Sequence, residues 1–241
     1  MNRSENKALF AFLVTTMFAA VLLLPAPRAQ NPEMQQRIAD LKQVIAFNKQ
    51  MLARYTWTEQ DIISIKGDEK KEELYEVRLG PDGKPQKNPL DPSSVSDDER
   101  RRRGLRGRII AKKTEEYKEY ADSIKTLVQQ YVPPDREMIQ QAYQAGNVMI
   151  GPEANAPGEY RLVFSNYIKP GDNMTLVISK AQKDVSSLSI STYLSDPSDA
   201  VNVNVQFNRL PNGPNHVSSE TINGVSKHLT IEVLNSNYQL M

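Results

Sequence analysis

The fold is decided by a stretch near the C-terminal end of the chain, in which apolar and polar residues alternate: Val201-Asn202-Val203-Asn204-Val205-Gln206-Phe207-Asn208. Successive side chains of a β-strand point to opposite faces of the sheet, so one face of this strand is apolar and the other is polar. The alternation therefore predicts a sheet with one face buried and the other in water, which is typical of antiparallel sheets.

The same pattern extends over the whole C-terminal part of the chain. Runs of β-type residues are separated by short turns rich in Pro, Gly, Asn and Asp, so we expect consecutive strands to pair as antiparallel neighbours. The expected strands are residues 148–151, 160–167, 174–181, 185–194, 200–209, 216–222 and 227–238.

A helix and a hairpin are expected before these strands. Apolar residues recur at spacings of three and four over residues 33–54, which predicts an amphipathic helix with one polar interruption, Asn48. Residues 55–66 and 72–79 are β-type runs separated by a short polar turn, and they predict a hairpin. Tyr75, Val77 and Leu79 share one face of its second strand.

The hairpin is followed by a turn and an irregular segment. Gly80-Pro81-Asp82-Gly83 predicts a tight turn, because Pro fixes φ at the second position and Gly tolerates a positive φ at the fourth. This segment lacks the spacing of a phosphate-binding loop. Residues 84–96 contain three prolines and three serines before the next helix, and they predict a loop.

A helical insertion of about residues 94–146 separates the hairpin from the later strands. It consists of a charged helix over residues 97–130, the breaker Pro133-Pro134 and a second helix over residues 136–145. The resulting expectation is one α+β domain over residues 30–241: a curved antiparallel β-sheet (half-barrel) of about nine strands with helices packed on its concave face.

The first 29 residues have the pattern of a signal peptide. Arg3 and Lys7 form a basic start, residues 8–24 are uncharged and mostly apolar, and Pro25-Ala26-Pro27-Arg28-Ala29 is typical of a cleavage region. A cleaved signal predicts a periplasmic or secreted protein. The alternative is an uncleaved N-terminal membrane anchor, because seventeen residues are at the lower limit of what spans a bilayer.

Charge and cysteine content restrict the partners of the mature chain. Removal of residues 1–29 takes away three basic residues and one acidic residue, which leaves 27 basic and 28 acidic side chains. A nearly neutral chain has no overall field that would attract nucleic acid, so we expect no nucleic-acid partner. The chain has no cysteine, which excludes disulfides and attachment of a lipid through a thiol.

No motif for catalysis, metal binding or a cofactor occurs in the sequence. His216 and His228 are the only histidines, they do not form a spaced pair, and we expect both at surface or edge-strand positions. A glycosidase-like pair of carboxylates cannot be recognised from spacing alone. The sequence therefore assigns no catalytic residue, no metal ligand and no cofactor.

An arginine cluster marks the start of the charged helix. Acidic residues precede and follow it, a pattern that favours a solvated helix stabilised by charge pairs. Contact with an anionic lipid surface or partner is the alternative interpretation. The arginines concerned are Arg100, Arg101, Arg102, Arg103, Arg106 and Arg108.

One set of mainly aromatic residues has two interpretations. At these spacings such side chains most often belong to the core, but they would line an apolar pocket if the helices leave part of the sheet uncovered. The candidate ligand-binding residues are Trp57, Tyr75, Val77, Tyr117, Tyr120 and Tyr131.

The order of these elements resembles the LolA/LolB-like lipoprotein-carrier superfamily and its periplasmic relatives. The resemblance is carried by Tyr55-Thr56-Trp57 at the first strand, by the segment from Val77 to Gly83, and by Asn235-Ser236-Asn237-Tyr238 near the end. It implies a half-barrel that shelters acyl chains. The expected function is thus an exported, non-enzymatic protein that binds a lipid or other apolar ligand, with an envelope protein partner or peripheral membrane contact.

Two other functions stay open at this point. One is a structural or protein-interaction module of the cell envelope, whose sheet is filled by its own helices. The other is an envelope hydrolase that uses scattered carboxylates. The space between sheet and helices distinguishes the three.

Overall fold

The computed structural model describes residues 47–90, 105–131 and 136–241. The expected signal peptide, most of the first expected helix and Arg100 to Arg103 lie outside these ranges. Arg106 and Arg108 lie within a helix, but their side chains are outside the described part. Contact of these arginines with an anionic surface therefore stays a prediction.

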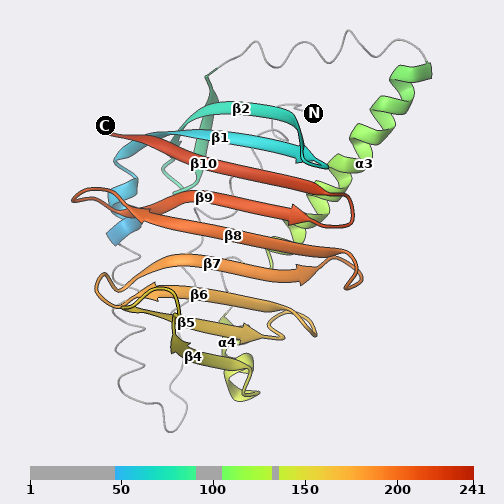
Figure 1. Ribbon diagram of the computed structural model, residues 1–241. Helices are drawn as coiled ribbons and strands as arrows, with labels where there is room; N and C mark the ends of the chain where they lie inside the picture. The colour runs from blue at the N-terminus through green and yellow to red at the C-terminus, as the bar shows by residue number, and fades with distance from the viewer. Residues whose placement is uncertain (1–46, 91–104, 132–135) are drawn as a thin grey trace.

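Ten strands form one open antiparallel sheet (Figure 1). Their order across the sheet is β3-β2-β1-β10-β9-β8-β7-β6-β5-β4. The strands are β1 (Tyr55–Ile65), β2 (Asp68–Leu79), β3 (Pro85–Pro89), β4 (Val148–Pro152), β5 (Glu159–Ser165), β6 (Asn173–Ser179), β7 (Asp184–Tyr193), β8 (Ala200–Arg209), β9 (Asn215–Gly224) and β10 (Leu229–Leu240). The predicted antiparallel sheet is confirmed, with ten strands instead of nine.

Two features of this order differ from a simple meander of hairpins. The first strand of the sheet pairs with the last, so that Tyr55 lies opposite Leu240 and Ile65 opposite Leu229. The strand β3 forms within residues 84–96, where a loop was predicted, and that prediction was wrong. Pro85 and Pro89 fit there because β3 is an edge strand, and an edge strand tolerates residues without an N–H donor.

The alternation in β8 separates the two faces of the sheet as predicted. Val201, Val203 and Val205 are buried, whereas Asn204 and Gln206 are exposed. The pattern is interrupted at a β-bulge between Gln206 and Phe207. Bulges shift the register of the strand that carries them, and Phe207 is accordingly only half-buried.

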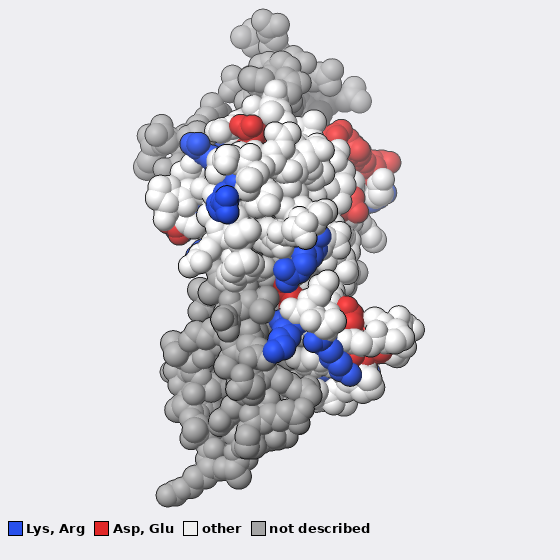
Figure 2. Space-filling view, turned by 90° about the vertical axis from the view of Figure 1, so that its left-hand side faces the viewer, with Lys and Arg blue, Asp and Glu red and all other residues white. Residues whose placement is uncertain are grey.

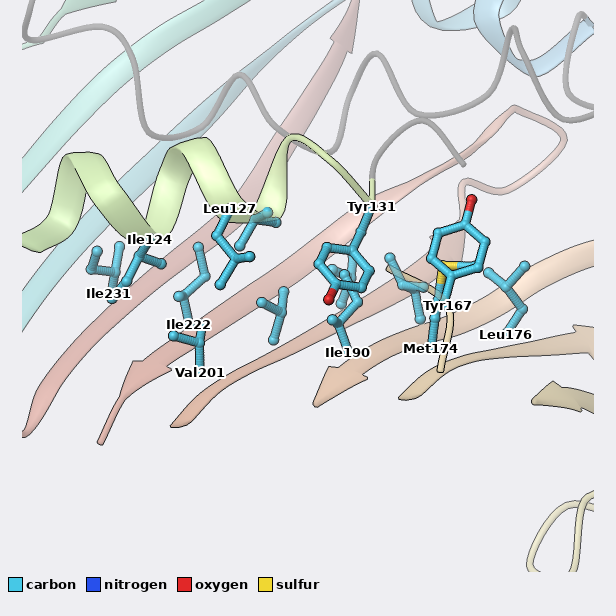
Figure 3. Packing of buried hydrophobic residues seen from close by; sticks show 14 of the residues in the cluster. Ile124, Leu127, Tyr131, Tyr167, Met174, Leu176, Ile190, Val201, Ile222 and Ile231 are labelled. Atoms are coloured by element: carbon cyan, nitrogen blue, oxygen red, sulfur yellow. The ribbon is translucent and has the colours of Figure 1, made fainter. Parts of the chain in front are cut away.

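The two described long helices are α3 (Leu105–Val128) and α4 (Arg136–Gln144). Ile124, Leu127 and Val128 of α3 are buried in the same hydrophobic core cluster as the apolar face of the sheet, as Figure 3 shows for Ile124 and Leu127 beside Val201, Ile222 and Ile231. No helix within the described ranges is both long and apolar enough to span a bilayer.

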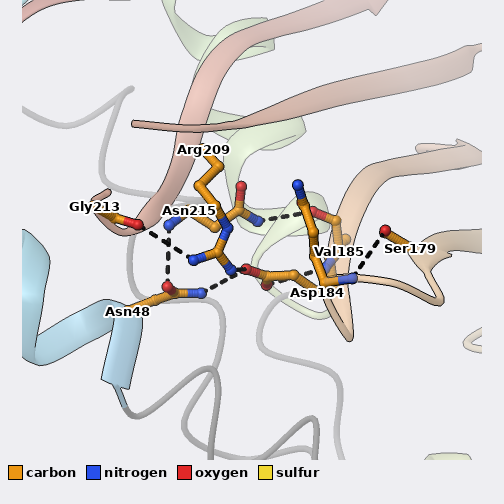
Figure 4. A network of polar contacts seen from close by, with 8 residues as sticks. Asn48, Ser179, Asp184, Val185, Arg209, Gly213 and Asn215 are labelled. Carbon is orange, nitrogen blue, oxygen red and sulfur yellow. Dashed lines mark hydrogen bonds and ion pairs between the residues drawn. The ribbon is translucent and has the colours of Figure 1, made fainter. Parts of the chain in front are cut away.

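A polar network holds the helical residues 47–52 against the sheet (Figure 4). Asn48, the polar interruption of the expected apolar stripe, donates from Nδ2 to Asp184 Oδ2 at 2.8 Å and accepts from the Asn215 backbone at 3.0 Å. Arg209 Nη2 donates to the same Asp184 oxygen at 2.7 Å. Asn48 is thus buried because it joins the end of this helix to the starts of β7 and β9.

Candidate ligand-binding site

Three of the six predicted ligand-binding residues lie together at one end of the sheet. Trp57, Tyr75 and Val77 are buried with Leu52 in a small hydrophobic cluster separate from the main core. The Trp57 ring stacks on Tyr238, with 5.5 Å between ring centres and 16° between ring planes. We call Trp57 of β1, Tyr75 and Val77 of β2 and Tyr238 of β10 the aromatic wall.

The other three predicted residues lie elsewhere, on or just after α3. Tyr120 and Tyr131 are buried in the main core, and Tyr117 is half-buried. The Tyr120 hydroxyl donates to Asp199 at 2.7 Å, and the Tyr131 hydroxyl donates to Asp172 at 2.5 Å. These two hydrogen bonds connect α3 and the residues just after it to loops between strands of the sheet. The structure thus does not bring the six residues into one cavity.

Next to the aromatic wall, the buried face of the sheet carries charged residues. Glu59 and Asp61 of β1 and Glu220 of β9 are buried. They do not belong to the main hydrophobic core, which begins with the next inward-facing residues of the same strands. The register explains their proximity: Asp61 lies opposite Val233 of β10, and Val233 lies opposite Glu220. The three carboxyl groups therefore lie on one face of the sheet, on β1 and β9, with β10 between these two strands.

One lysine reaches this group from the edge strand β3. Lys87 Nζ forms ion pairs with Glu59 and, at 3.0 Å, with Asp61 Oδ2. The same ammonium lies 5.0 Å from the centre of the Tyr75 ring. The Lys87 side chain is only 2% exposed, so it is an internal partner of the carboxyl groups. We call Glu59, Asp61, Lys87 and Glu220 the acid–lysine cluster.

Burial controls the ionisation of the cluster. It raises the pKa of Glu59 to about 8. The neighbouring Lys87 lowers this pKa, and the neighbouring Asp61 raises it further. Burial also raises the pKa of Glu220 to about 8, and the neighbouring Glu59 and Asp61 act in the same direction. Glu220, which forms no ion pair among the described residues, is therefore mostly protonated at neutral pH.

His216 borders the cluster and was expected at the surface or on an edge strand. That prediction was wrong, because His216 is 7% exposed and its ring centre lies 4.1 Å from that of Tyr238. Burial lowers the pKa of His216 to about 4, so the imidazole is neutral at pH 7. His228, by contrast, is exposed, in the turn before β10.

Several buried polar atoms at this end of the sheet have no hydrogen-bond partner among the described residues. Nearly all buried polar groups of folded proteins are hydrogen-bonded, so a concentration of exceptions needs an explanation. They lie on the three adjacent strands β1, β10 and β9. The atoms are Trp57 Nε1, Asp61 Oδ1, His216 Nδ1, Glu220 Oε1 and Asn235 Oδ1.

Sequence reasoning missed the polar residues of this site. One signal was available, because Trp57, Glu59 and Asp61 are two residues apart in a β-type run and so share a face. Glu220 and Lys87 carried no comparable signal, since their positions depend on which strands become neighbours. Within the described ranges, no group of three or more His, Asp or Glu side chains is arranged to hold a metal ion.

A concave feature lies at the opposite end of the strands. An open groove of about 590 Å³ is lined by the ends of β9 and β10 and by the turn between β1 and β2, including Lys66, Asn223 and His228. It contains none of the predicted ligand-binding residues. At the end of the sheet where β8 joins β9, basic and acidic side chains are interspersed among uncharged residues (Figure 2).

Comparison with known proteins gives similarity to solved structures alone. No family model and no curated protein matches the chain. A crystal structure of a DUF1329 family protein from Desulfovibrio piger is similar over 84% of this chain and 92% of its own, with 9% identity and a TM-score of 0.38. A LolA superfamily protein from Nitrosomonas europaea is similar over 83% of this chain and 93% of its own, with 9% identity and a TM-score of 0.35. A LolA superfamily protein is therefore among the solved structures to which this chain is similar.

Proposed function

We propose that this chain is an exported, non-enzymatic binding protein of the half-barrel type, which holds an amphipathic ligand at the β1–β2–β3 end of its sheet. The observation that carries the proposal is the concentration of unpartnered buried polar atoms beside the aromatic wall. A ligand with polar and apolar parts would satisfy both surfaces. The N-terminal signal pattern supports export to the periplasm.

The two walls of the site differ in chemistry, and this difference supports an amphipathic ligand over a purely apolar one. Trp57, Tyr75 and Val77 offer an apolar surface with the stacked Tyr238. Asp61 and Glu220 offer oxygen atoms that lack donors among the described residues. Leaving such groups unsatisfied costs about 1–3 kcal/mol each, so a polar ligand group that pairs with them gains affinity.

Access from the sheet edge is consistent with this function. β3 has five residues and pairs only with β2. It carries Lys87, which covers the acid–lysine cluster from that side. A short edge strand bounded by prolines is held by few ladder hydrogen bonds, and its displacement opens a route to the cluster.

A second function, an interaction or structural module with a filled core, is favoured by the α3 side of the sheet. Ile124, Val128 and Tyr131 have no exposed surface there. This half of the sheet is occupied by the chain's own side chains. The two functions differ in what they predict for Trp57, which is the only tryptophan of the chain.

Tryptophan fluorescence of the full chain tests the proposal at the site itself. Titration with 11-bromoundecanol, whose bromine quenches indole at short range, is expected to quench Trp57 saturably. Tyr75→Ala removes part of the aromatic wall and is expected to weaken binding about tenfold, the equivalent of about 1.4 kcal/mol. Tyr143→Ala, at an exposed tyrosine of α4, is the matched control and is expected to change nothing. Absence of saturable quenching would overturn the binding function and favour the interaction module.

A further inference from the structure

The site has more hydrogen-bond acceptors than donors. Among its unpartnered atoms, Asp61 Oδ1 and Asn235 Oδ1 are acceptors, Glu220 Oε1 is an acceptor once its carboxyl group is ionised, and Trp57 Nε1 is a fixed donor. The three carboxyl groups also share a single ammonium, that of Lys87, which pairs with Glu59 and Asp61 and leaves Glu220 Oε1 without a partner among the described residues. The complementary ligand group therefore donates several hydrogen bonds and carries a positive charge.

Lys87 shows how an ammonium is held at this site. Its Nζ contacts Glu59 and Asp61 and lies over the ring of Tyr75, so carboxylates and an aromatic face surround it together. This combination is typical of ammonium recognition in proteins. Lys87 leaves the Oδ1 atom of Asp61 and the Oε1 atom of Glu220 without donors, and Glu220 is only 2% exposed.

We propose that the head group bound here is a primary ammonium on an apolar chain, held by Glu220 and the free oxygen of Asp61, with its chain along Trp57 and Tyr238. The inference rests on the proposed binding function and specifies its ligand class. Free alkylamines and lipids with an aminoethyl head group share this chemistry.

Binding of an ammonium at Glu220 releases the proton of its carboxyl group. Before an ammonium binds, Glu220 is mostly a neutral acid at pH 7, because burial raises its pKa to about 8. When the ammonium arrives, the carboxyl O–H bond breaks, the proton leaves to solvent, and the carboxylate pairs with the ammonium. The other titratable groups that face the site are Glu59 and Asp61 of β1, Glu73 and Tyr75 of β2, Lys87 of β3, His216 of β9 and Tyr238 of β10.

The test compares probes that differ only in their head group. The full chain is titrated with 11-bromoundecylamine, 11-bromoundecanol and 11-bromoundecanoate while Trp57 fluorescence is recorded. We expect the amine to bind at least about tenfold more tightly than the other two, the range of a charge-assisted hydrogen bond. Calorimetry in two buffers of different ionisation enthalpy is expected to show release of about one proton per amine at pH 7.

Glu220→Gln keeps the size of the side chain and a neutral state, so it is expected to fold and to reduce amine affinity to that of the alcohol. Glu232→Gln on β10, which pairs with Ile62 and Thr221 rather than with residues of the cluster, is the matched control. A lysophospholipid with an ethanolamine head group, added as a competitor, distinguishes the sources: recovery of Trp57 fluorescence identifies an aminolipid, and persistent quenching identifies the free amine.

The outcomes separate this inference from the proposed function. Equal affinity for all three probes, without proton release, would overturn the ammonium inference and leave the binding function intact. Failure of every probe to quench Trp57 would overturn both. Selective amine binding that Glu220→Gln leaves unchanged would also overturn the inference, because another group would then hold the ammonium.

Discussion

Gly224 of β9 lies directly against Tyr120 of α3. A Cβ atom added at position 224 would lie 2.5 Å from Tyr120 Cε1 and 2.7 Å from Ile124 Cδ1, closer than real side chains approach one another. The absence of a side chain at this position is therefore what lets the helix approach the sheet.

Gly224→Ala is expected to lower the free energy of unfolding by about 1–3 kcal/mol, because two buried side chains of α3 must move to admit the methyl group. Urea denaturation followed by circular dichroism measures this change. Gly151→Ala on β4 is the matched control, since nothing lies within 4 Å of its added Cβ. Equal effects of the two substitutions would show that α3 does not pack on β9 as described.

Glu220→Gln is expected to change how stability depends on pH. The folded pKa of Glu220 is about 8 against an ordinary value of 4.5, so folding binds a proton between these values and stability falls as pH rises from about 4.5 to about 8. Glutamine does not titrate. The increase in Tm caused by the substitution should therefore be larger at pH 8 than at pH 5, by at least about 3 °C, which corresponds to about 1 kcal/mol.

Thermal melts at both pH values measure this difference, and Glu232→Gln serves as control. His216 acts in the opposite direction: its pKa of about 4 in the folded chain lies below the ordinary 6.5, so its contribution is lost as pH falls from about 6.5 to about 4. A constant difference between wild type and Glu220→Gln from pH 5 to pH 8 would contradict the buried, neutral state of Glu220.

Asn48→Ala is expected to destabilise the fold by about 1–3 kcal/mol, because it removes one donor from the buried Asp184 and leaves the Asn215 N–H without its acceptor. Urea denaturation provides the measurement. Asn204→Ala removes the same side chain from an exposed position on β8 and is expected to change stability by no more than about 0.5 kcal/mol. If both variants are equally stable, the network around Asp184 does not anchor residues 47–52.

Tyr131→Phe is expected to lower the free energy of unfolding by about 1–2 kcal/mol. The hydroxyl lies 2.5 Å from Asp172 Oδ2 and 2.6 Å from Thr192 Oγ1, and neither contact survives its removal. Tyr143→Phe, at the exposed tyrosine of α4, is the control for loss of a hydroxyl alone. A loss no larger than that of the control would mean that the fold does not depend on the hydroxyl of Tyr131.

The local pattern of the sequence was sufficient to predict most of the secondary structure. The strand predicted over residues 200–209 coincides with β8, and α3 lies within the predicted helical residues 97–130. These predictions succeeded because alternation and helical spacing depend on residues near one another in the chain. β3 was missed because Pro85 and Pro89 are typical of loops, and only its edge position makes a strand compatible with them.

The acid–lysine cluster was not predictable in the same way. Glu59 and Asp61 share a face with Trp57, but charged residues in a strand usually mark the face in water, and Ile62 on the other face makes the pattern ambiguous. Glu220 meets them only because β10 lies between β1 and β9. The proximity of β1 and β9 depends on the pairing of β1 with β10, and local sequence patterns do not predict which distant strands pair.

The pairing of β1 with β10 also determines the order in which the molecule can be assembled. β1, β2 and β3 form hairpins from adjacent segments, and so do β4 to β10, whereas β1 and β10 are separated by most of the described chain. Contacts between distant segments close large loops and form slowly. Asp61 and Glu220 lie on opposite sides of this junction, so the acid–lysine cluster does not form until the last strand has joined the sheet. A chain truncated before residue 229 can fold its hairpins, but it cannot assemble the site.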